Sequence, residues 1–230
     1  MNKDVIVALD FDDINKLEIF LKHFDKPIYV KVGMELFYAY GPNIIELIKK
    51  YNHKVFLDLK LHDIPNTVKS AMKVINKLDV DMVNVHALGG LKMMKEAREA
   101  LDNSIKLIAV THLTSTKNEN LKDDLSIDDD LKNAILKLAG NAKKANLDGV
   151  VCSALESKII KNQCGENFLT ICPGIRRKID NPNDQIRIVT PQEAHEIGCD
   201  YIVVGRPITQ SDNNKIVYNE FKNKFLGELI

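Results

Sequence analysis

Hydrophobic and polar positions follow two alternating patterns along the chain. Eight short apolar runs rich in β-branched residues recur, and each is followed by a stretch with apolar residues at helical spacing. The runs are Val5–Phe11, Ile28–Gly33, Val55–Leu61, Met82–Ala87, Lys106–Leu113, Gly149–Ser153, Phe168–Gly174 and Tyr201–Arg206. Because the runs are apolar on both faces, they predict strands of a parallel sheet covered by helices, in eight βα units.

The number of units favours a closed barrel over an open sheet. Eight βα units in 230 residues match a (β/α)8 TIM barrel, for which ~250 residues are typical. The alternative is an open doubly wound sheet, but the turn Asp10-Phe11-Asp12-Asp13 after the first run contains no glycine-rich phosphate loop. The sequence shows no linker or composition break, so we expect a single α/β barrel domain over residues 1–230.

Composition narrows the class of protein. The 32 basic and 32 acidic residues give a formal net charge of zero, which argues against a broad nucleic-acid surface. The four cysteines form no C-x-x-C pair, which is typical of a reduced, cytosolic protein. The start of the chain has no long apolar signal region, and no apolar run approaches the ~20 residues of a membrane span. We therefore expect a soluble, cytoplasmic protein with no nucleic-acid or membrane partner.

Charged residues interrupt the third apolar run. Side chains in a strand alternate faces with a period of two, so Asp58 and Lys60 share a face, which in a barrel can be the inward one. An ionised pair in that position is costly unless it is paired and functional. Lys31 on the neighbouring strand can lie beside Asp58 or Asp63, and alternating charges would keep all four groups ionised. The alternative for Asp63 is a surface position beyond the strand.

Two glycine-arginine turns predict an anion site. Gly174 precedes Arg176 after the seventh run, and Gly205 precedes Arg206 after the eighth. Barrels of this type often bind phosphate at those two loops, where glycine permits close backbone approach and arginine supplies a bidentate fork. The alternative is two ordinary turns with surface arginines. The long connections 115–130 and 175–190 are expected to be functional loops.

The histidines suggest no metal centre. His23, His53 and His195 are expected at helices and exposed, whereas His86 and His112 end strands and either line the site or pack. No set of two histidines and two carboxylates falls at strand ends in the pattern that a divalent metal would need. We therefore expect no metal.

The third run and the residues after it carry a resemblance to a known family. The segment Asp58-Leu59-Lys60-Leu61-His62-Asp63-Ile64-Pro65-Asn66-Thr67 resembles the signature of the orotidine 5′-phosphate decarboxylase family. Other segments correspond in order: Ala8–Asp10, Val30–Gly33, Val83–Ala87, Leu113–Ser115, Asp148–Ser153, Pro173–Arg176, Asn183–Gln185 and Val203–Arg206. The ten-residue motif is specific, and the whole pattern resembles the short bacterial form. The resemblance implies cofactor-free decarboxylation of orotidine 5′-monophosphate to uridine 5′-monophosphate, the last step of de novo UMP biosynthesis.

The resemblance also implies a role for each matched residue. Asp10 and Lys31 would hold ribose hydroxyls, Asp58 would face the substrate carboxylate, and Lys60 would protonate the carbon that loses carbon dioxide. Thr114 would contact the ligand near its base. The phosphate would be held by Arg176, Gln185, Gly205 and Arg206. The enzyme would be a homodimer with shared active sites, and the residues reaching into the partner's site would be Asp63, Ile64 and Thr67.

Two other functions remain open at this point. One is a metal-assisted decarboxylase or epimerase of sugar phosphates, built on a similar barrel and a similar Asp-x-Lys-x-x-Asp strand. Lys31 and Gln185 favour the nucleotide alternative, and a chelator would discriminate because only the sugar-phosphate enzyme needs magnesium. The other is a non-catalytic barrel that binds a phosphorylated ligand. A scaffold has no need of buried charges, so the set of Lys31, Asp58, Lys60 and Asp63 argues against it.

Overall fold

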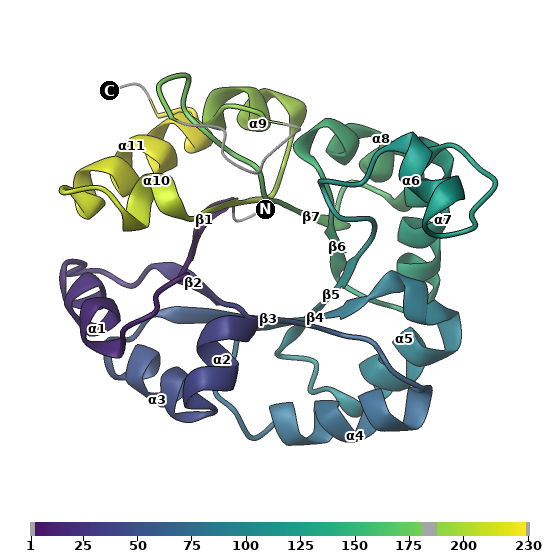
Figure 1. Ribbon diagram of the computed structural model, residues 1–230, viewed down its shortest axis with the longest axis horizontal. Coiled ribbons are helices and arrows are strands. Elements are labelled where there is room, and N and C mark those ends of the chain that lie inside the picture. Colours follow the sequence, from purple (N-terminus) through teal and green to yellow (C-terminus); the bar gives the residue numbers. More distant parts are fainter. Residues whose placement is uncertain (1–2, 181–187, 229–230) are drawn as a thin grey trace.

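The eight predicted strands form one closed parallel barrel. The computed structural model describes residues 3–180 and 188–228. Each strand pairs with its neighbours in sequence, and β8 closes the ring against β1. Figure 1 shows the strands as a ring with the helices around it. The strands are β1 Asp4–Ala8, β2 Tyr29–Val32, β3 Lys54–Leu61, β4 Met82–His86, β5 Lys106–Val110, β6 Gly149–Val151, β7 Leu169–Cys172 and β8 Tyr201–Val204. The (β/α)8 prediction is confirmed.

Helices separate the strands and cover the outside of the barrel. Several begin at side-chain caps, as at Ser153, where the side chain of Glu156 accepts a hydrogen bond from the Ser153 backbone N–H at 2.9 Å. The helices are α1 Ile14–Lys22, α2 Met34–Tyr40, α3 Asn43–Lys50, α4 Pro65–Ile75, α5 Gly90–Ala100, α6 Asn118–Asp123, α7 Leu131–Lys144, α8 Ala154–Cys164, α9 Pro191–Ile197, α10 Arg206–Thr209 and α11 Asn214–Leu226, with a 3₁₀ turn at Ala87–Gly89.

Two apolar layers hold this arrangement together. The larger one lies between the strands and the helices. The smaller one fills the barrel with residues that share the inward face of their strands, namely Ile6, Ala8, Tyr29, Phe56, Met82, Ile108, Ile171, Tyr201 and Val203. Because side chains alternate faces along a strand, the residues two before and two after Phe56 in β3 also face inward. These residues are charged: Lys54 lies before Phe56 and Asp58 lies after it.

The structure differs from the sequence-based expectations in three places. Five of the eight strands end two or three residues before the ends of the predicted runs, because the last residues of those runs belong to the loops at the carboxyl end of the barrel. The expected loop 115–130 contains α6, which is anchored by the buried Leu121. His53 is 1% exposed rather than on the surface, and its Nδ1 accepts a hydrogen bond from the Ile28 backbone N–H at 3.2 Å.

None of the helices within the described ranges has the length and apolar character needed to cross a membrane.

Candidate active site

The end of β3 has an irregular backbone that positions Lys60. The register between β3 and β4 shifts between Leu57 and Leu61, and Lys60 has a φ of 52°. A non-glycine residue in this left-handed region is uncommon and persists only where its surroundings hold it. Here the Lys60 backbone N–H donates a hydrogen bond to the Asn84 side-chain oxygen at 2.8 Å. The strained backbone directs the lysine toward the mouth of the barrel.

Three charged side chains meet at the carboxyl ends of β2 and β3. Lys60 Nζ lies 2.8 Å from Asp58 Oδ1, and Lys31 Nζ lies 3.3 Å from Asp58 Oδ2. Lys31 Nζ is also 3.9 Å from Asp10 Oδ1 on the segment after β1. The two ammonium groups therefore hold the two oxygens of one carboxylate, as the alternating charges of the sequence predict for Asp58.

Asp58 is the most buried member of this group. Its side chain is 11% exposed, against 15% for Lys31 and 30% for Lys60. Burial alone would raise the pKa of Asp58, but the charges of Lys31 and Lys60 outweigh it, aided by hydrogen bonds from Lys60 and Asn84. The net direction is a lowered pKa, so the carboxylate stays ionised at neutral pH.

Asn84 completes the group, a role that no sequence motif indicates. Its Nδ2 donates to Asp58 Oδ1 at 2.6 Å, while its oxygen accepts from the Lys60 backbone. The side chain is fully buried, two residues after Met82 on the inward face of β4. An amide between Val83 and Val85 in the middle of a buried strand is the signal that could have identified it, because buried polar groups need partners.

A cavity of about 260 Å³ opens beside these residues at the carboxyl end of the barrel. Four of the predicted site residues line it, namely Lys31, Asp58, Lys60 and Thr114. Its walls also include apolar side chains from the barrel interior, such as Phe56, Ile171 and Val203. A pocket with apolar walls and a few convergent charges is typical of a small-molecule site.

The predicted phosphate residues come from the ends of β7 and β8. Gly205 precedes the short helix α10, and a Cβ added to it would lie 3.4 Å from Asp10 Oδ2, so the segments after β1 and β8 are adjacent. Gly174 has a φ of 81°. Arg176 is 5% exposed and donates to its neighbour's carbonyl, Ile175 O, at 2.8 Å.

One arginine of that loop is paired with carboxylates away from the predicted anion site. Arg177 next to Arg176 is paired with Asp180 at 2.8 Å and with Glu220 at 2.8 Å, so it ties the loop to α11. The predicted contact Gln185 lies outside the described residues.

The structure does not bring Asp63 to the lysines of its own chain. Asp63, Ile64 and Thr67 are all exposed around the start of α4, and the Asp63 carboxylate accepts a hydrogen bond from the Ile64 backbone N–H at 2.6 Å. Within this chain the ion pairs of Lys31 and Lys60 run to Asp10 and Asp58 instead. A role for these three residues in the partner's site stays a prediction.

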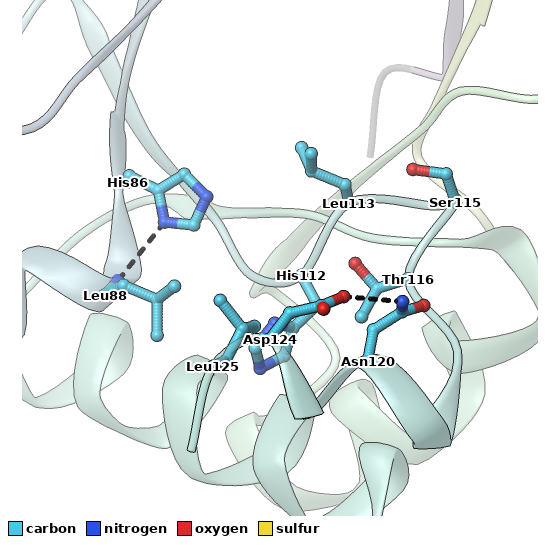
Figure 2. Close-up of a pocket in the computed structure, with 9 residues that line it drawn as sticks. All are labelled: His86, Leu88, His112, Leu113, Ser115, Thr116, Asn120, Asp124 and Leu125. Atoms are coloured by element: carbon cyan, nitrogen blue, oxygen red, sulfur yellow. Dashed lines mark hydrogen bonds between the residues drawn. The ribbon is translucent and has the colours of Figure 1, made fainter. Parts of the chain in front are cut away.

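A second cavity of about 350 Å³ lies beside the first one and shares His112, Leu113 and Ser115 with it. Figure 2 shows its lining, with Asn120 of α6 and His86 on opposite sides. The His86 ring stacks on His62 with centroids 5.5 Å apart. Burial, followed by the neighbouring histidines and Lys60, lowers the pKa of His86 to about 4. His86 is therefore neutral at pH 7, and its Nδ1 accepts from the Leu88 backbone N–H at 3.3 Å.

The chemistry of the candidate site is that of a fixed cation next to a cavity. Lys60 can stabilise negative charge that develops on a bound ligand, and it can donate a proton. Asp58 holds the ammonium in place and presents negative charge to the same cavity. Among the described residues, no three His, Cys, Asp or Glu side chains gather in a way that could hold a metal ion.

Comparisons with known proteins point to one family. A family model described as "Orotidine 5′-phosphate decarboxylase / HUMPS family" matches residues 3–221. Proteins named orotidine 5′-phosphate decarboxylase from Streptococcus gordonii and Staphylococcus aureus are 50% and 52% identical to this chain, covering 96% of it and 96% and 97% of their own lengths. The crystal structure of the Lactobacillus acidophilus orotidine 5′-phosphate decarboxylase matches with a TM-score of 0.86 and 40% identity, over 97% of this chain and 99% of that chain. The chain belongs to the orotidine 5′-phosphate decarboxylase / HUMPS family.

Proposed function

We propose that Lys60 is the proton donor in the decarboxylation of orotidine 5′-monophosphate. The chain is an orotidine 5′-phosphate decarboxylase, which catalyses the final step of pyrimidine biosynthesis. The single observation that supports the role of Lys60 is its strained, inward-directed position at the cavity, 2.8 Å from Asp58. The relatives named above carry the nucleotide enzyme's name at 50–52% identity, which favours this function over the sugar-phosphate alternative.

The proposed reaction uses no cofactor that could accept the electron pair left on the substrate when carbon dioxide departs. The bond between the pyrimidine ring and its carboxylate breaks, carbon dioxide leaves, and the electron pair stays on the ring carbon. The ammonium of Lys60 stabilises that carbanion and then transfers a proton to it, which gives uridine 5′-monophosphate. Asp58 faces the substrate carboxylate and disfavours the ground state by like-charge repulsion, which the departure of carbon dioxide relieves. Lys31 keeps Asp58 ionised by its charge.

The phosphate of the substrate would bind at the other side of the mouth. Gly205 and Arg206 follow β8, and Arg176 follows β7, in the two loops where barrels of this type hold phosphate. Asp10 lies against Gly205 and within 3.9 Å of Lys31, so it occupies the position between phosphate and base where ribose hydroxyls would lie. Contacts at the phosphate then contribute binding energy that helps to organise the reacting end.

An absorbance assay tests this function directly. Purified protein with a metal chelator should consume orotidine 5′-monophosphate at the same rate as protein without it. Lys60→Ala should abolish turnover and leave the circular dichroism spectrum unchanged, because the variant lacks the ammonium proposed to stabilise the carbanion and deliver the proton. Lys158→Ala, an exposed lysine of α8, is the matched control and should keep full activity. Loss of activity with chelator would support the metal-assisted alternative, and substantial activity in Lys60→Ala would overturn the assigned role.

We further propose a homodimer in which each active site includes residues of both subunits. Large apolar side chains are exposed on the segments after β2, β3, β4 and β5, namely Met34, Ile64, Leu88, Leu113 and Leu125. A group of exposed apolar side chains on one end of a protein commonly marks an interaction surface. Asp63 lies in the same region, and among the described residues it forms no ion pair with a lysine. In a two-fold symmetric interface, the loop that contains Asp63 in each subunit would reach the carboxyl end of the other subunit's barrel.

Mixing two inactive variants tests the shared site. In a heterodimer of Lys60→Ala and Asp63→Ala chains, one site contains both changes and the other contains neither. With subunit exchange, about one quarter of all sites in an equimolar random mixture would be intact, so activity should return. A mixture of Lys60→Ala with Asp58→Ala is the control, because both residues serve their own subunit's site and no intact site forms. No recovery in the first mixture, despite demonstrated exchange, would place Asp63 in its own subunit's site.

We also propose that residues 1–230 form a single catalytic domain located in the cytoplasm. The pairing of β1 with β8 supports the first point, because the two ends of the described chain belong to one sheet. The second is supported by four cysteines that are all free and buried, as is usual in a reducing compartment.

A further inference from the structure

The largest of the described cavities lies at the amino-terminal mouth of the barrel, opposite the candidate active site. Its volume is about 630 Å³, and it shares no lining residue with the cavity at Lys60. Its walls are formed by the first inward-facing residues of several strands, among them Tyr29 of β2, Lys54 of β3 and Lys106 of β5. The space is comparable to that of small-molecule sites.

The lining of this mouth contains four lysines and three carboxylates, and two of the carboxylates are held by internal partners. Asp4 is paired with Lys222 at 3.3 Å. Asp81 is held by Lys49 at 2.8 Å and by the Val55 backbone N–H at 2.8 Å. Glu228 is exposed. Neither Lys54 nor Lys106 forms an ion pair with any residue in the described part of the chain, although both line the cavity.

Further donors extend the same surface. Lys3 reaches the mouth from the amino-terminal segment, where its Nζ donates to the His195 carbonyl at 3.3 Å. The lining therefore contains four lysines, and only Lys222 among them is neutralised by a carboxylate of the lining.

The second observation is the hydroxyl group of Tyr29. Tyr29 is 3% exposed and lines the cavity, and its oxygen has no hydrogen-bond partner among the described residues. A buried tyrosine hydroxyl normally finds a partner. Its ring is fixed edge-on against Tyr201, with centroids 5.9 Å apart. Burial, followed by the negative charge of the nearby Asp81, raises the pKa of Tyr29, so its hydroxyl stays protonated and keeps a hydrogen to donate.

We infer that the amino-terminal mouth binds a small polyphosphate anion. Lys54 and Lys106 supply two point charges, which suit phosphate oxygens, and the Tyr29 hydroxyl donates a hydrogen bond to the same ligand. The polar lining excludes an apolar ligand. This site is separate from the phosphate position proposed near Arg206, because the packed layer of Phe56, Ile6 and Ile108 lies between the two mouths.

Inorganic pyrophosphate is the probe for this site. Binding is measured by calorimetry in the presence of saturating uridine 5′-monophosphate, which fills the carboxyl-end site, and is located by backbone amide shifts. We expect one pyrophosphate per chain, with shifts at Tyr29, Lys54 and Lys106. The double variant Lys54→Gln/Lys106→Gln should lose about tenfold or more in affinity. Lys158→Gln, the exposed α8 control, should bind as the wild type does.

Tyr29→Phe separates a ligand contact from a structural role. Because the hydroxyl has no partner among the described residues, its removal should not lower the thermal unfolding temperature, while pyrophosphate affinity should fall a few-fold. The inference is overturned if pyrophosphate does not bind at millimolar concentration. It is also overturned if the lysine double variant binds equally well, or if shifts appear only at Gly205 and Arg206.

Discussion

Replacing Asp58 by asparagine tests whether this carboxylate holds the site together. The change keeps the shape of the side chain but leaves Lys31 and Lys60 without the carboxylate that they contact at 3.3 and 2.8 Å. Removing one partner of a buried ion pair costs roughly 3–5 kcal/mol. Lys60 is 30% exposed and can turn toward solvent, so we expect a loss of about 2–4 kcal/mol in the free energy of unfolding.

Urea unfolding at pH 7 measures this loss, with Asp12→Asn as the control. Asp12 also contacts a lysine, Lys16 at 3.4 Å, but the two side chains are 78% and 63% exposed. An exposed pair contributes roughly 0–1 kcal/mol, so the control should be nearly neutral. If Asp58→Asn loses no more stability than Asp12→Asn, the carboxylate does not carry the electrostatic role that its position indicates.

The same comparison has a defined pH dependence. The folded pKa of Asp58 is lower than its unfolded value, so the unfolded chain binds more protons between the two values. Stability from this group is therefore complete above an unfolded pKa of about 4 and declines as the pH falls through the folded pKa. The difference in stability between the wild type and Asp58→Asn should shrink over that acidic range and stay constant above it.

Three other substitutions test separate parts of the structure. Arg206→Ala should weaken binding of orotidine 5′-monophosphate by about 1.5–3 kcal/mol and have little effect on orotidine, which lacks the phosphate; equal losses would mean that the phosphate is held elsewhere. Asn84→Ala should lower kcat more than it raises KM, because Asn84 fixes the strained Lys60 backbone; an unchanged kcat would contradict this. Gly149→Ala should destabilise the barrel by about 1–3 kcal/mol, since its Cβ would lie 2.2 Å from the Leu169 carbonyl oxygen. In a denaturant titration Gly140→Ala in helix α7 should instead be neutral or stabilising by up to about 1 kcal/mol, and a loss there equal to that of Gly149→Ala would refute the steric argument.

The sequence predicts the barrel well because hydrophobic periodicity is a local property. Each of the eight apolar runs overlaps a strand, and the run Val55–Leu61 differs from β3, Lys54–Leu61, by one residue. The strand ends are less well predicted, because loop residues such as Thr111 and His112 remain buried and therefore resemble strand residues in the sequence. The short helix α6 was missed because its sequence, Asn118–Asp123, is polar apart from Leu121.

The sequence predicts the candidate site only where the residues that contact each other are close together along the chain. Asp58 and Lys60 are two residues apart on one strand, so the period of two was enough to place them together. Asn84 joins them through hydrogen bonds that span 24 and 26 residues, which no local pattern encodes. Asp63 shows that closeness in sequence is not sufficient either. It lies three residues after Lys60 but does not join the ion pairs of Lys60 in its own chain, so its proposed role depends on a second subunit.

Strand β3 shows why the two mouths of the barrel can act independently. Its inward-facing residues are Lys54, Phe56, Asp58 and Lys60, with charge at both ends and an aromatic ring in the layer between. Lys54 and Asp58 are four residues apart, or about 13 Å along the strand. Substitutions more than ~7–10 Å apart with no shared partner usually add within about 0.5 kcal/mol. The stability losses of Lys54→Gln and Asp58→Asn should therefore add in the double variant, and a larger coupling would show that charge at one mouth is transmitted through the Phe56 layer to the other.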